Sequence, residues 1–308
     1  MPAYIREAYQ QDGFVVVPDV IDSDECASLA ELVERVVGDQ EAILREQRAE
    51  LFTTPGRHGG GIQTMEEGRG LRSTLEVSDD LSVAWELARP TRFYPECPEF
   101  AAVSCDKRIG ALANELLGGE AMLYADQAFL KPPGKGAPRS WHQDNWYFGL
   151  TNSADVLTAW VALDDADELN GALRYRSGSH KQGVVAHTAN GAERTIAAEH
   201  LAPDATEVVA AVRRGGVVFH HGATQHSSGT NTTSRPRRAY GVHYVRRGSA
   251  FWSDAGVTNG LPLKALLAVP GLSEAGDQVD PVVVGEAGRI NVKNGDVGLR
   301  DECASARL

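Results

Sequence analysis

The chain has few cysteines and no long hydrophobic run, and each absence excludes a class of protein. Four cysteines occur in 308 residues, and no two of them form a Cys-x-x-Cys pair. Isolated cysteines are typical of reduced thiols in the cytosol, so we expect neither a disulfide framework nor a cysteine zinc site. No apolar run approaches the length of a membrane span, and the N-terminus lacks a secretory signal pattern. We therefore expect a cytoplasmic protein with no membrane partner.

Basic residues are outnumbered by acidic ones. The chain has 30 Lys and Arg residues against 42 Asp and Glu residues, and its formal net charge is −12. Nucleic-acid binders present a basic face, so we expect no nucleic-acid partner. The hydrophobic fraction of 42% and the charged fraction of 23% are those of a soluble globular protein. The sequence leaves the oligomeric state open.

The first 120 residues are expected to be mainly helical. A helix is expected at Ala3–Asp12, where Gly13 ends it, followed by a short buried strand at Phe14–Val17. Further helices are expected to begin at Asp22 or Ser23 and to cover Glu41–Leu51, Leu81–Ala88 and Arg108–Leu117. Thr53–Arg72 is rich in glycine and is expected to be a long loop, either functional or merely flexible.

From about residue 121 the pattern changes to strands. The expected strands are Met122–Lys131, Ser140–Phe148, Val156–Leu163, Ala172–Tyr175, Glu207–Val212, Gly216–His221 and Arg237–Val245. Strands that follow one another without intervening helices predict antiparallel pairing in a barrel or a sandwich. No internal repeat and no linker divides the chain.

The segment Ser140–Gly149 contains a candidate metal motif. His142 and Asp144 are two residues apart, and in a strand such residues point to the same face. With a second histidine they would form the two-histidine, one-carboxylate set that suits Fe(II) and leaves coordination positions open. The alternative is a surface hydrogen-bonded pair. If the strand is regular, Trp146 lies on the same face, either as a substrate wall or as plain core.

The segment Gly215–Gly229 supplies candidates for the second histidine. It is expected to be a strand that runs into a turn, and it carries His220, His221 and His226. Eleven residues after His226, Arg237 shares a strand face with two small residues, which predicts open space beside its guanidinium. Such a fork suits bidentate capture of a carboxylate, whereas the alternative is a surface arginine paired with an acid.

With these motifs in order, the chain resembles the phytanoyl-CoA dioxygenase family of Fe(II)- and 2-oxoglutarate-dependent oxygenases. The likeness runs from about Tyr9 to about Val245. Its motifs are Gln11–Pro18, Lys131-Pro132-Pro133, His142-Gln143-Asp144, Ala159-Trp160, Asn170–Leu173, Ser177–Lys181, His226-x-Ser-Gly-x-Asn and Arg237.

The resemblance implies a role for each matching residue. His142, Asp144 and His226 would bind iron, and Arg237 would bind the distal carboxylate of 2-oxoglutarate. Ser228 and Lys131 match positions that help to hold this co-substrate, and Trp160 matches one that lines its site. The turn after His226 and the step to Arg237 favour His226 over His220 and His221. Because Asp144 is present, halogenation, which needs a small residue there, is disfavoured.

The resemblance also implies a fold and a reaction. We expect a mainly β protein with flanking helices and a double-stranded β-helix (jelly-roll, cupin-like) core. Residues 1–308 would form one dioxygenase domain, with a helical part at about 1–120, the core at about 121–247 and a peripheral tail at about 248–308. Fe(II), 2-oxoglutarate and O2 would together hydroxylate a C–H bond of a small molecule.

Alternatives to hydroxylation stay open. The same centre could catalyse desaturation, epimerisation or cyclisation, and a non-catalytic binding protein could retain the barrel. A zinc hydrolase fits poorly because it would leave Arg237 without a role. The acidity of the chain, with no evident basic run for a nucleotide diphosphate, favours a free small molecule over a CoA thioester.

Overall fold

A computed structural model describes residues 2–34, 62–65, 72–77, 83–89, 98–134, 138–190, 193–250 and 267–268. The helix expected at Glu41–Leu51 and most of the glycine-rich segment lie outside these residues, as does nearly all of the tail beyond residue 250. Among the described residues, no helix is both long and apolar enough to cross a membrane.

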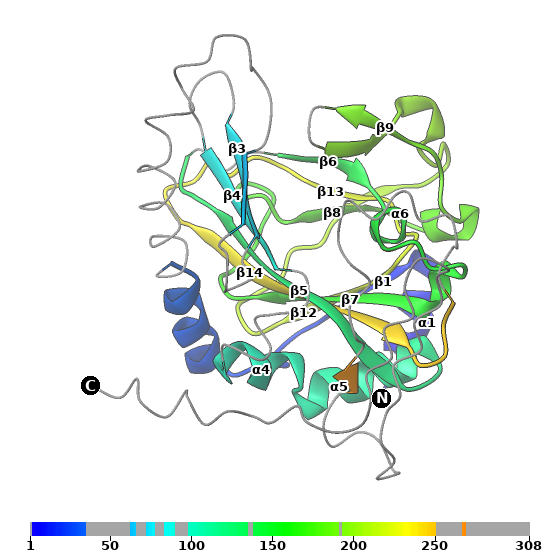
Figure 1. Cartoon of the computed structure of the whole chain (residues 1–308), viewed down its shortest axis with the longest axis horizontal. Helices are drawn as coiled ribbons and strands as arrows, with labels where there is room; N and C mark the ends of the chain where they lie inside the picture. The colour runs from blue at the N-terminus through cyan, green and yellow to red at the C-terminus, as the bar shows by residue number, and fades with distance from the viewer. Residues whose placement is uncertain are drawn as a thin grey trace.

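Two antiparallel sheets form the centre of the molecule (Figure 1). The large sheet has the strand order β1-β12-β7-β14-β5-β4-β3-β2, with β15 beside β5. Its strands are β1 (Phe14–Val17), β2 (Ile62–Met65), β3 (Arg72–Val77), β4 (Val83–Arg89), β5 (Ala121–Lys131), β7 (Val156–Ala162), β12 (Val217–His221), β14 (Arg237–Arg246) and β15 (Leu267–Ala268).

The small sheet faces the large one and has the order β11-β8-β13-β6. Its strands are β6 (Arg139–His142), β8 (Leu173–Arg176), β11 (Glu207–Val209) and β13 (His226–Ser228). A separate hairpin of β9 (His187–Asn190) and β10 (Glu193–Ile196) lies next to β6. Short 3-10 helices occur at Ser153–Asp155, Ser179–Gln182 and Ala198–His200.

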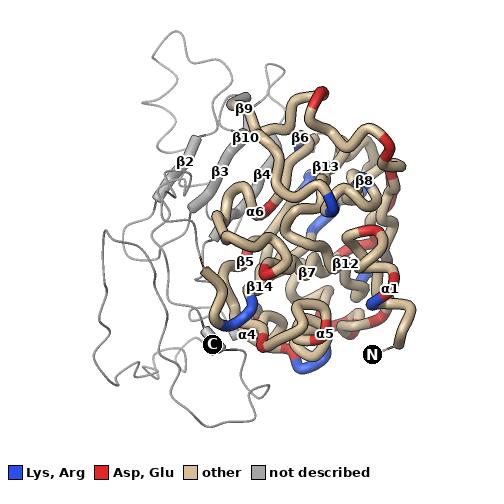
Figure 2. The backbone as a smooth tube through the Cα atoms, turned by 90° about the vertical axis from the view of Figure 1, so that its right-hand side faces the viewer, with Lys and Arg blue, Asp and Glu red and all other residues tan. Residues whose placement is uncertain are grey.

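Helices cover the face of the large sheet that points away from the small sheet (Figure 2). They are α1 (Ala3–Asp12), residues 23–34, α4 (Pro98–Ser104) and α5 (Lys107–Leu117). The α1 helix ends at Gly13, whose φ of 81° is left-handed. Helix α5 contacts β5, β7 and β14.

Strand β7 divides two hydrophobic cores because successive side chains point to opposite faces. Leu157, Ala159 and Val161 pack toward the helices, whereas Trp160 and Ala162 pack between the sheets. All seven residues of β7 are buried. A strand covered on both faces therefore carries the continuous apolar run that the sequence shows.

The N-terminal part differs from its predicted structure in two places. The helix predicted at Leu81–Ala88 is wrong, because Val83–Arg89 forms β4 and pairs with β3 and β5. The glycine-rich segment is not a loop throughout, because Ile62–Met65 forms β2. In both places pairing within the large sheet outweighs the local preference of the sequence.

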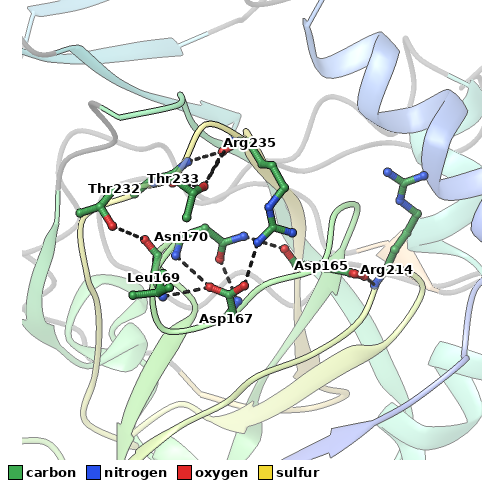
Figure 3. A network of polar contacts seen from close by, with 9 residues as sticks. Asp165, Asp167, Leu169, Asn170, Arg214, Thr232, Thr233 and Arg235 are labelled. Atoms are coloured by element: carbon green, nitrogen blue, oxygen red, sulfur yellow. Dashed lines mark hydrogen bonds and ion pairs between the residues drawn. The ribbon is translucent and has the colours of Figure 1, made fainter.

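The turn between β13 and β14 is tied to the loop after β7 (Figure 3). Arg235 Nη2 donates to Asp167 Oδ2 at 2.9 Å, and the Thr232 hydroxyl and backbone N–H both donate to the Leu169 carbonyl. These contacts hold the turn that leads directly into Arg237, the first residue of β14.

Candidate metal centre

His142 and His226 face each other as a cross-strand pair. They are Cα partners in the pairing of β6 with β13, and their ring centroids are 4.1 Å apart. Each imidazole Nδ1 contacts a backbone carbonyl, that of Ser140 at 2.8 Å and that of Thr224 at 3.0 Å. Because a carbonyl only accepts, both Nδ1 atoms carry the proton, and both Nε2 atoms keep a lone pair for a metal.

Asp144 completes the group from a different kind of element. It is the first residue of α6, a five-residue helix at Asp144–Phe148. One ligand atom from each of His142, Asp144 and His226 lies within 4.8 Å of the others, and these three form the metal-binding group found among the described residues. The Asp144 Oδ1 lies 3.6 Å from His226 Nε2.

The strand predicted at Ser140–Phe148 is therefore wrong in its second half. The strand ends at His142, and one helical turn follows, which Gly149 ends at a φ of 72°. The Asn145 N–H donates to the Gly222 carbonyl at 2.9 Å, and the Asn145 side chain exchanges hydrogen bonds with the backbone of Leu150. These contacts fold the segment back, so Asp144 turns toward the histidines without strand alternation.

The placement of Trp146 by strand alternation fails for the same reason. Its indole stacks on the imidazole of His187, with centroids 4.6 Å apart and planes 13° apart. The indole Nε1 is buried and has no hydrogen-bond partner among the described residues. Trp146 therefore packs against the hairpin of β9 and β10.

A row of three residues across the large sheet faces Asp144. Thr158 on β7 is the Cα partner of both His220 on β12 and His243 on β14. Asp144 Oδ2 accepts from Thr158 Oγ1 at 2.5 Å and from His220 Nε2 at 2.9 Å, and His243 Nδ1 contacts Thr158 Oγ1 at 2.8 Å. His220 thus contacts the carboxylate and is not a member of the metal-binding group.

The other competing histidine lies away from the group. His221 Nδ1 accepts a hydrogen bond from the Ala223 N–H at 3.0 Å, and its ring lies beside Tyr9. The segment predicted to be one strand and a turn is in fact two strands in different sheets. β12 carries His220 into the large sheet and β13 carries His226 into the small one.

Burial and mutual proximity set the protonation states of the group. Burial lowers the pKa of His226 to about 4, and burial together with repulsion from His226 lowers that of His142. Burial alone would raise the pKa of Asp144, but His226 and His220 hold it well below its usual range. Two neutral imidazoles and an ionised carboxylate are the forms that bind a metal.

This donor set fits Fe(II). Two imidazole nitrogens and one carboxylate on one side of a metal form the facial arrangement used by non-haem iron oxygenases, with other positions left open. Cysteine ligands, which would favour zinc, do not occur in the group.

The four residues predicted for the co-substrate occupy one corner between the sheets. The Arg237 guanidinium carbon lies 5.4 Å from the Trp160 ring centroid, and Arg237 is the Cα partner of Lys131. Lys131 Nζ donates to the Gly229 carbonyl at 2.5 Å, and Gly229 follows Ser228, the last residue of β13. Arg237 is 3% exposed and Lys131 is 6% exposed, so two cationic side chains are buried here.

The space expected beside Arg237 is partly filled. A Cβ atom at Gly241 would lie 2.8 Å from the Phe129 ring, so this glycine accommodates an aromatic side chain. Arg238 has the structural role expected of a paired arginine, because it forms a two-point contact with Asp164 and a further ion pair with Glu34.

Sequence reasoning missed the roles of Thr158, Tyr175 and His243. Tyr175, on β8, is the Cα partner of His226, and its hydroxyl lies 2.8 Å from His220 Nδ1. The available signal was a histidine or a threonine within an apolar strand, which is also compatible with an ordinary core position. Their grouping around Asp144 and His220 follows from strand register, which the sequence does not reveal.

The chain is similar to a known protein family, to individual relatives and to solved structures. The family model of phytanoyl-CoA dioxygenase (PhyH) matches residues 9–239. "Phytanoyl-CoA dioxygenase domain-containing protein 1" of Bos taurus is 26% identical over 80% of this chain and 91% of its own length. "Ectoine dioxygenase" of Bordetella parapertussis is 27% identical over 75% of this chain and 71% of its own length.

Among solved structures, the epimerase SnoN in complex with Fe3+, alpha ketoglutarate and nogalamycin RO has a similar fold. Its TM-score is 0.60 at 24% identity, with 91% of this chain and 92% of that chain covered. The match confirms the mainly β, jelly-roll class expected from the sequence.

Proposed function

The chain belongs to the phytanoyl-CoA dioxygenase family, and from that premise we propose that it hydroxylates an unactivated C–H bond of a small molecule. It is a dioxygenase that depends on Fe(II) and 2-oxoglutarate, and in the proposed reaction 2-oxoglutarate is converted to succinate and CO2. The convergence of His142, Asp144 and His226 is the observation that carries the proposal.

In this proposal the three residues hold the metal. His142 and His226 each offer Nε2, because their Nδ1 protons are engaged by backbone carbonyls. Asp144 offers Oδ1, because Oδ2 already accepts two hydrogen bonds. When bound with 2-oxoglutarate, Fe(II) supplies the activation of O2 that oxidises the substrate.

Arg237 binds the distal carboxylate of 2-oxoglutarate. A guanidinium forms two parallel hydrogen bonds to a carboxylate, and burial strengthens them because water does not compete. Lys131 adds a second positive charge in the same corner, and Trp160 and Ser228 line it. The negative charge of the distal carboxylate would lie close to both buried cations.

Trp146 contacts the substrate. Its indole N–H is buried without a hydrogen-bond partner among the described residues, so a bound molecule can supply the missing acceptor. The stack on His187 fixes the plane of the ring. A free small molecule is preferred over a CoA thioester because the chain is acidic, and one relative is named for its action on ectoine.

The first experiment separates an enzyme from a binding protein. Under anaerobic conditions, calorimetry with Fe(II) should give one site per chain, and 2-oxoglutarate should bind only after the metal. His226→Ala should lose the metal, whereas alanine at the exposed His200 should not alter binding. A wild-type protein that binds neither ligand would be a non-catalytic member of the fold.

A second experiment identifies the reaction type. With O2 and a substrate panel, hydroxylation adds the mass of one oxygen atom to the product and forms one succinate per turnover. Epimerisation leaves the mass unchanged, and desaturation or cyclisation removes two hydrogens. Epimerisation is kept as the second candidate because the epimerase SnoN has this fold. A product without added oxygen would overturn the hydroxylase proposal but would leave the proposed iron site standing.

A further inference from the structure

With His220 neutral, the hydrogen bonds around the Asp144 carboxylate have one consistent direction. An ionised carboxylate accepts and never donates, so both partners of Oδ2 must donate to it. His220 Nε2 therefore carries a proton, and in the neutral ring Nδ1 is an acceptor. The Tyr175 hydroxyl, 2.8 Å from Nδ1, must then donate to His220.

The second partner of Oδ2 is ordered in the same way. The Thr158 hydroxyl has a single proton, which it donates to Asp144. Its oxygen must therefore accept a hydrogen bond from His243 Nδ1 at 2.8 Å. The His243 Nε2 is buried and has no hydrogen-bond partner among the described residues. The hydrogen bond from Nδ1 to Thr158 is therefore the polar contact that orients the His243 ring. All four side chains are 3% exposed or less: Tyr175, Thr158, His220 and His243. Bulk water therefore does not compete for these hydrogen bonds.

Two donor arms thus converge on a single oxygen. One arm runs from Tyr175 through His220, and the other runs from His243 through Thr158. The first arm begins in the small sheet at Tyr175, whereas the other three residues form the row across the large sheet. Neither arm reaches Oδ1, which instead faces His226 Nε2 at 3.6 Å.

We infer that Thr158 and His220, oriented by His243 and Tyr175, are positioning residues that restrict Asp144 to binding the metal through Oδ1 alone. The inference rests on the proposed function, since it takes Asp144 as a metal ligand. A carboxylate that binds through one oxygen keeps three positions of the facial site open, whereas binding through both oxygens would occupy one of them. Two of these positions are needed by a chelating co-substrate.

One substitution in each arm removes a hydroxyl group with little change in side-chain shape. Thr158→Val replaces the hydroxyl by a methyl group, and Thr158→Ser keeps the hydroxyl as a conservative rescue. Tyr175→Phe removes only the hydroxyl that orients His220. The readout is the Kd for Mn(II), a redox-stable ion for such a site, measured by calorimetry on the folded, metal-free protein, with its thermal unfolding recorded in parallel.

Thr158→Val should weaken Mn(II) binding by about 10–100-fold, the range found when groups that orient metal ligands are removed. Tyr175→Phe should weaken it in the same direction but less, because the hydroxyl acts through His220. Thr158→Ser should bind like the wild type. The matched control is Tyr244→Phe, which removes another fully buried hydroxyl, bonded to the Ser104 carbonyl, and should leave the Kd unchanged.

The outcomes are distinct. Wild-type affinity in both Thr158→Val and Tyr175→Phe overturns the inference, and so does an equal loss in Tyr244→Phe, which would indicate general loosening. If Thr158→Val does not fold, Tyr175→Phe decides alone. If the wild type binds no Mn(II), the proposed function itself is overturned, and the inference with it.

Discussion

Arg237 and Arg238 are neighbours in the chain, but they lie on opposite faces of β14. Arg237 lies between the sheets beside Trp160, whereas Arg238 points outward to Asp164 and Glu34. Alternation along a strand thus assigns the two guanidinium groups different environments. Comparing them separates co-substrate binding from stability.

Arg237→Ala should raise the KM for 2-oxoglutarate by about 10–100-fold, because hydrogen bonds to a charged group contribute about 1.5–3 kcal/mol. The rate of succinate formation at varied 2-oxoglutarate concentration measures the change. Arg238→Ala is the matched control and should lower the unfolding temperature while leaving this KM unchanged. An unchanged KM in Arg237→Ala would mean that another residue binds the distal carboxylate.

At the residue scale, the sequence identifies functional residues best where a side-chain type in a motif has few structural roles that could explain it. The sequence motifs predict roles for His142, Asp144, His226 and Arg237, and the structure brings the first three within reach of one ion. The sequence predicts no role for Thr158, because a threonine in an apolar strand has no distinguishing pattern. Its role depends on being opposite both His220 and His243, which is a property of strand register.

At the scale of elements, Gly13 joins three segments. It ends α1 in the left-handed region, and its carbonyl accepts from the His221 N–H and from the Thr224 hydroxyl, just before β13. A side chain here would meet the His180 ring and the Thr224 hydroxyl. Gly118 ends α5 with a φ of 64°, but a Cβ there would have no atom within 4 Å.

Gly13→Ala should therefore lower the free energy of unfolding more than Gly118→Ala. The left-handed conformation alone costs about 1–2 kcal/mol for a residue with a Cβ, and crowding adds about 1–3 kcal/mol at Gly13. Urea denaturation of both variants measures the difference. Equal losses would show that the neighbours of Gly13 relax at no cost.

The elements were predicted well where one strong signal dominates. The helix at Ala3–Asp12 is confirmed to the residue, because Gly13 stops it and a β-branched run follows. The turn of helix at Asp144–Phe148 was missed because its aromatic residues favour strands and its stabilising contacts come from Gly222 and Leu150. Gly149, an ordinary helix C-cap, was the local signal that could have corrected the prediction.

For the molecule as a whole, buried histidines make stability depend on pH. Burial lowers the pKa of His187 to about 4, of His221 to about 3 and of His243 to about 4. In the unfolded chain the same side chains have a pKa of about 6.5. Between these values the unfolded state binds more protons than the folded state, so stability is lost as the pH falls below about 6.5.

Lowering the pH from 7 to 5 should therefore destabilise the metal-free protein, by up to about 2 kcal/mol for each of these histidines. Urea midpoints at the two pH values measure the loss. His221→Asn keeps an acceptor for the Ala223 N–H and should reduce the pH dependence by one proton. Identical wild-type midpoints at pH 7 and pH 5 would contradict the burial of these rings in their neutral form.

The pairing of His142 with His226 across β6 and β13 also bears on how the centre is assembled. The separation of these two side chains is fixed by the distance between adjacent strands, whatever the length of chain that connects them. The connecting chain includes the β9–β10 hairpin, which carries the residue that stacks on Trp146. The hairpin is bonded to the metal motif beside its ligands, since the Gln143 N–H donates to His187 Nε2 and Thr195 Oγ1 donates to the Trp141 carbonyl. The spacing of the two imidazoles is thus set by one pair of strands, whereas the surroundings of Trp146 are set by a separate hairpin.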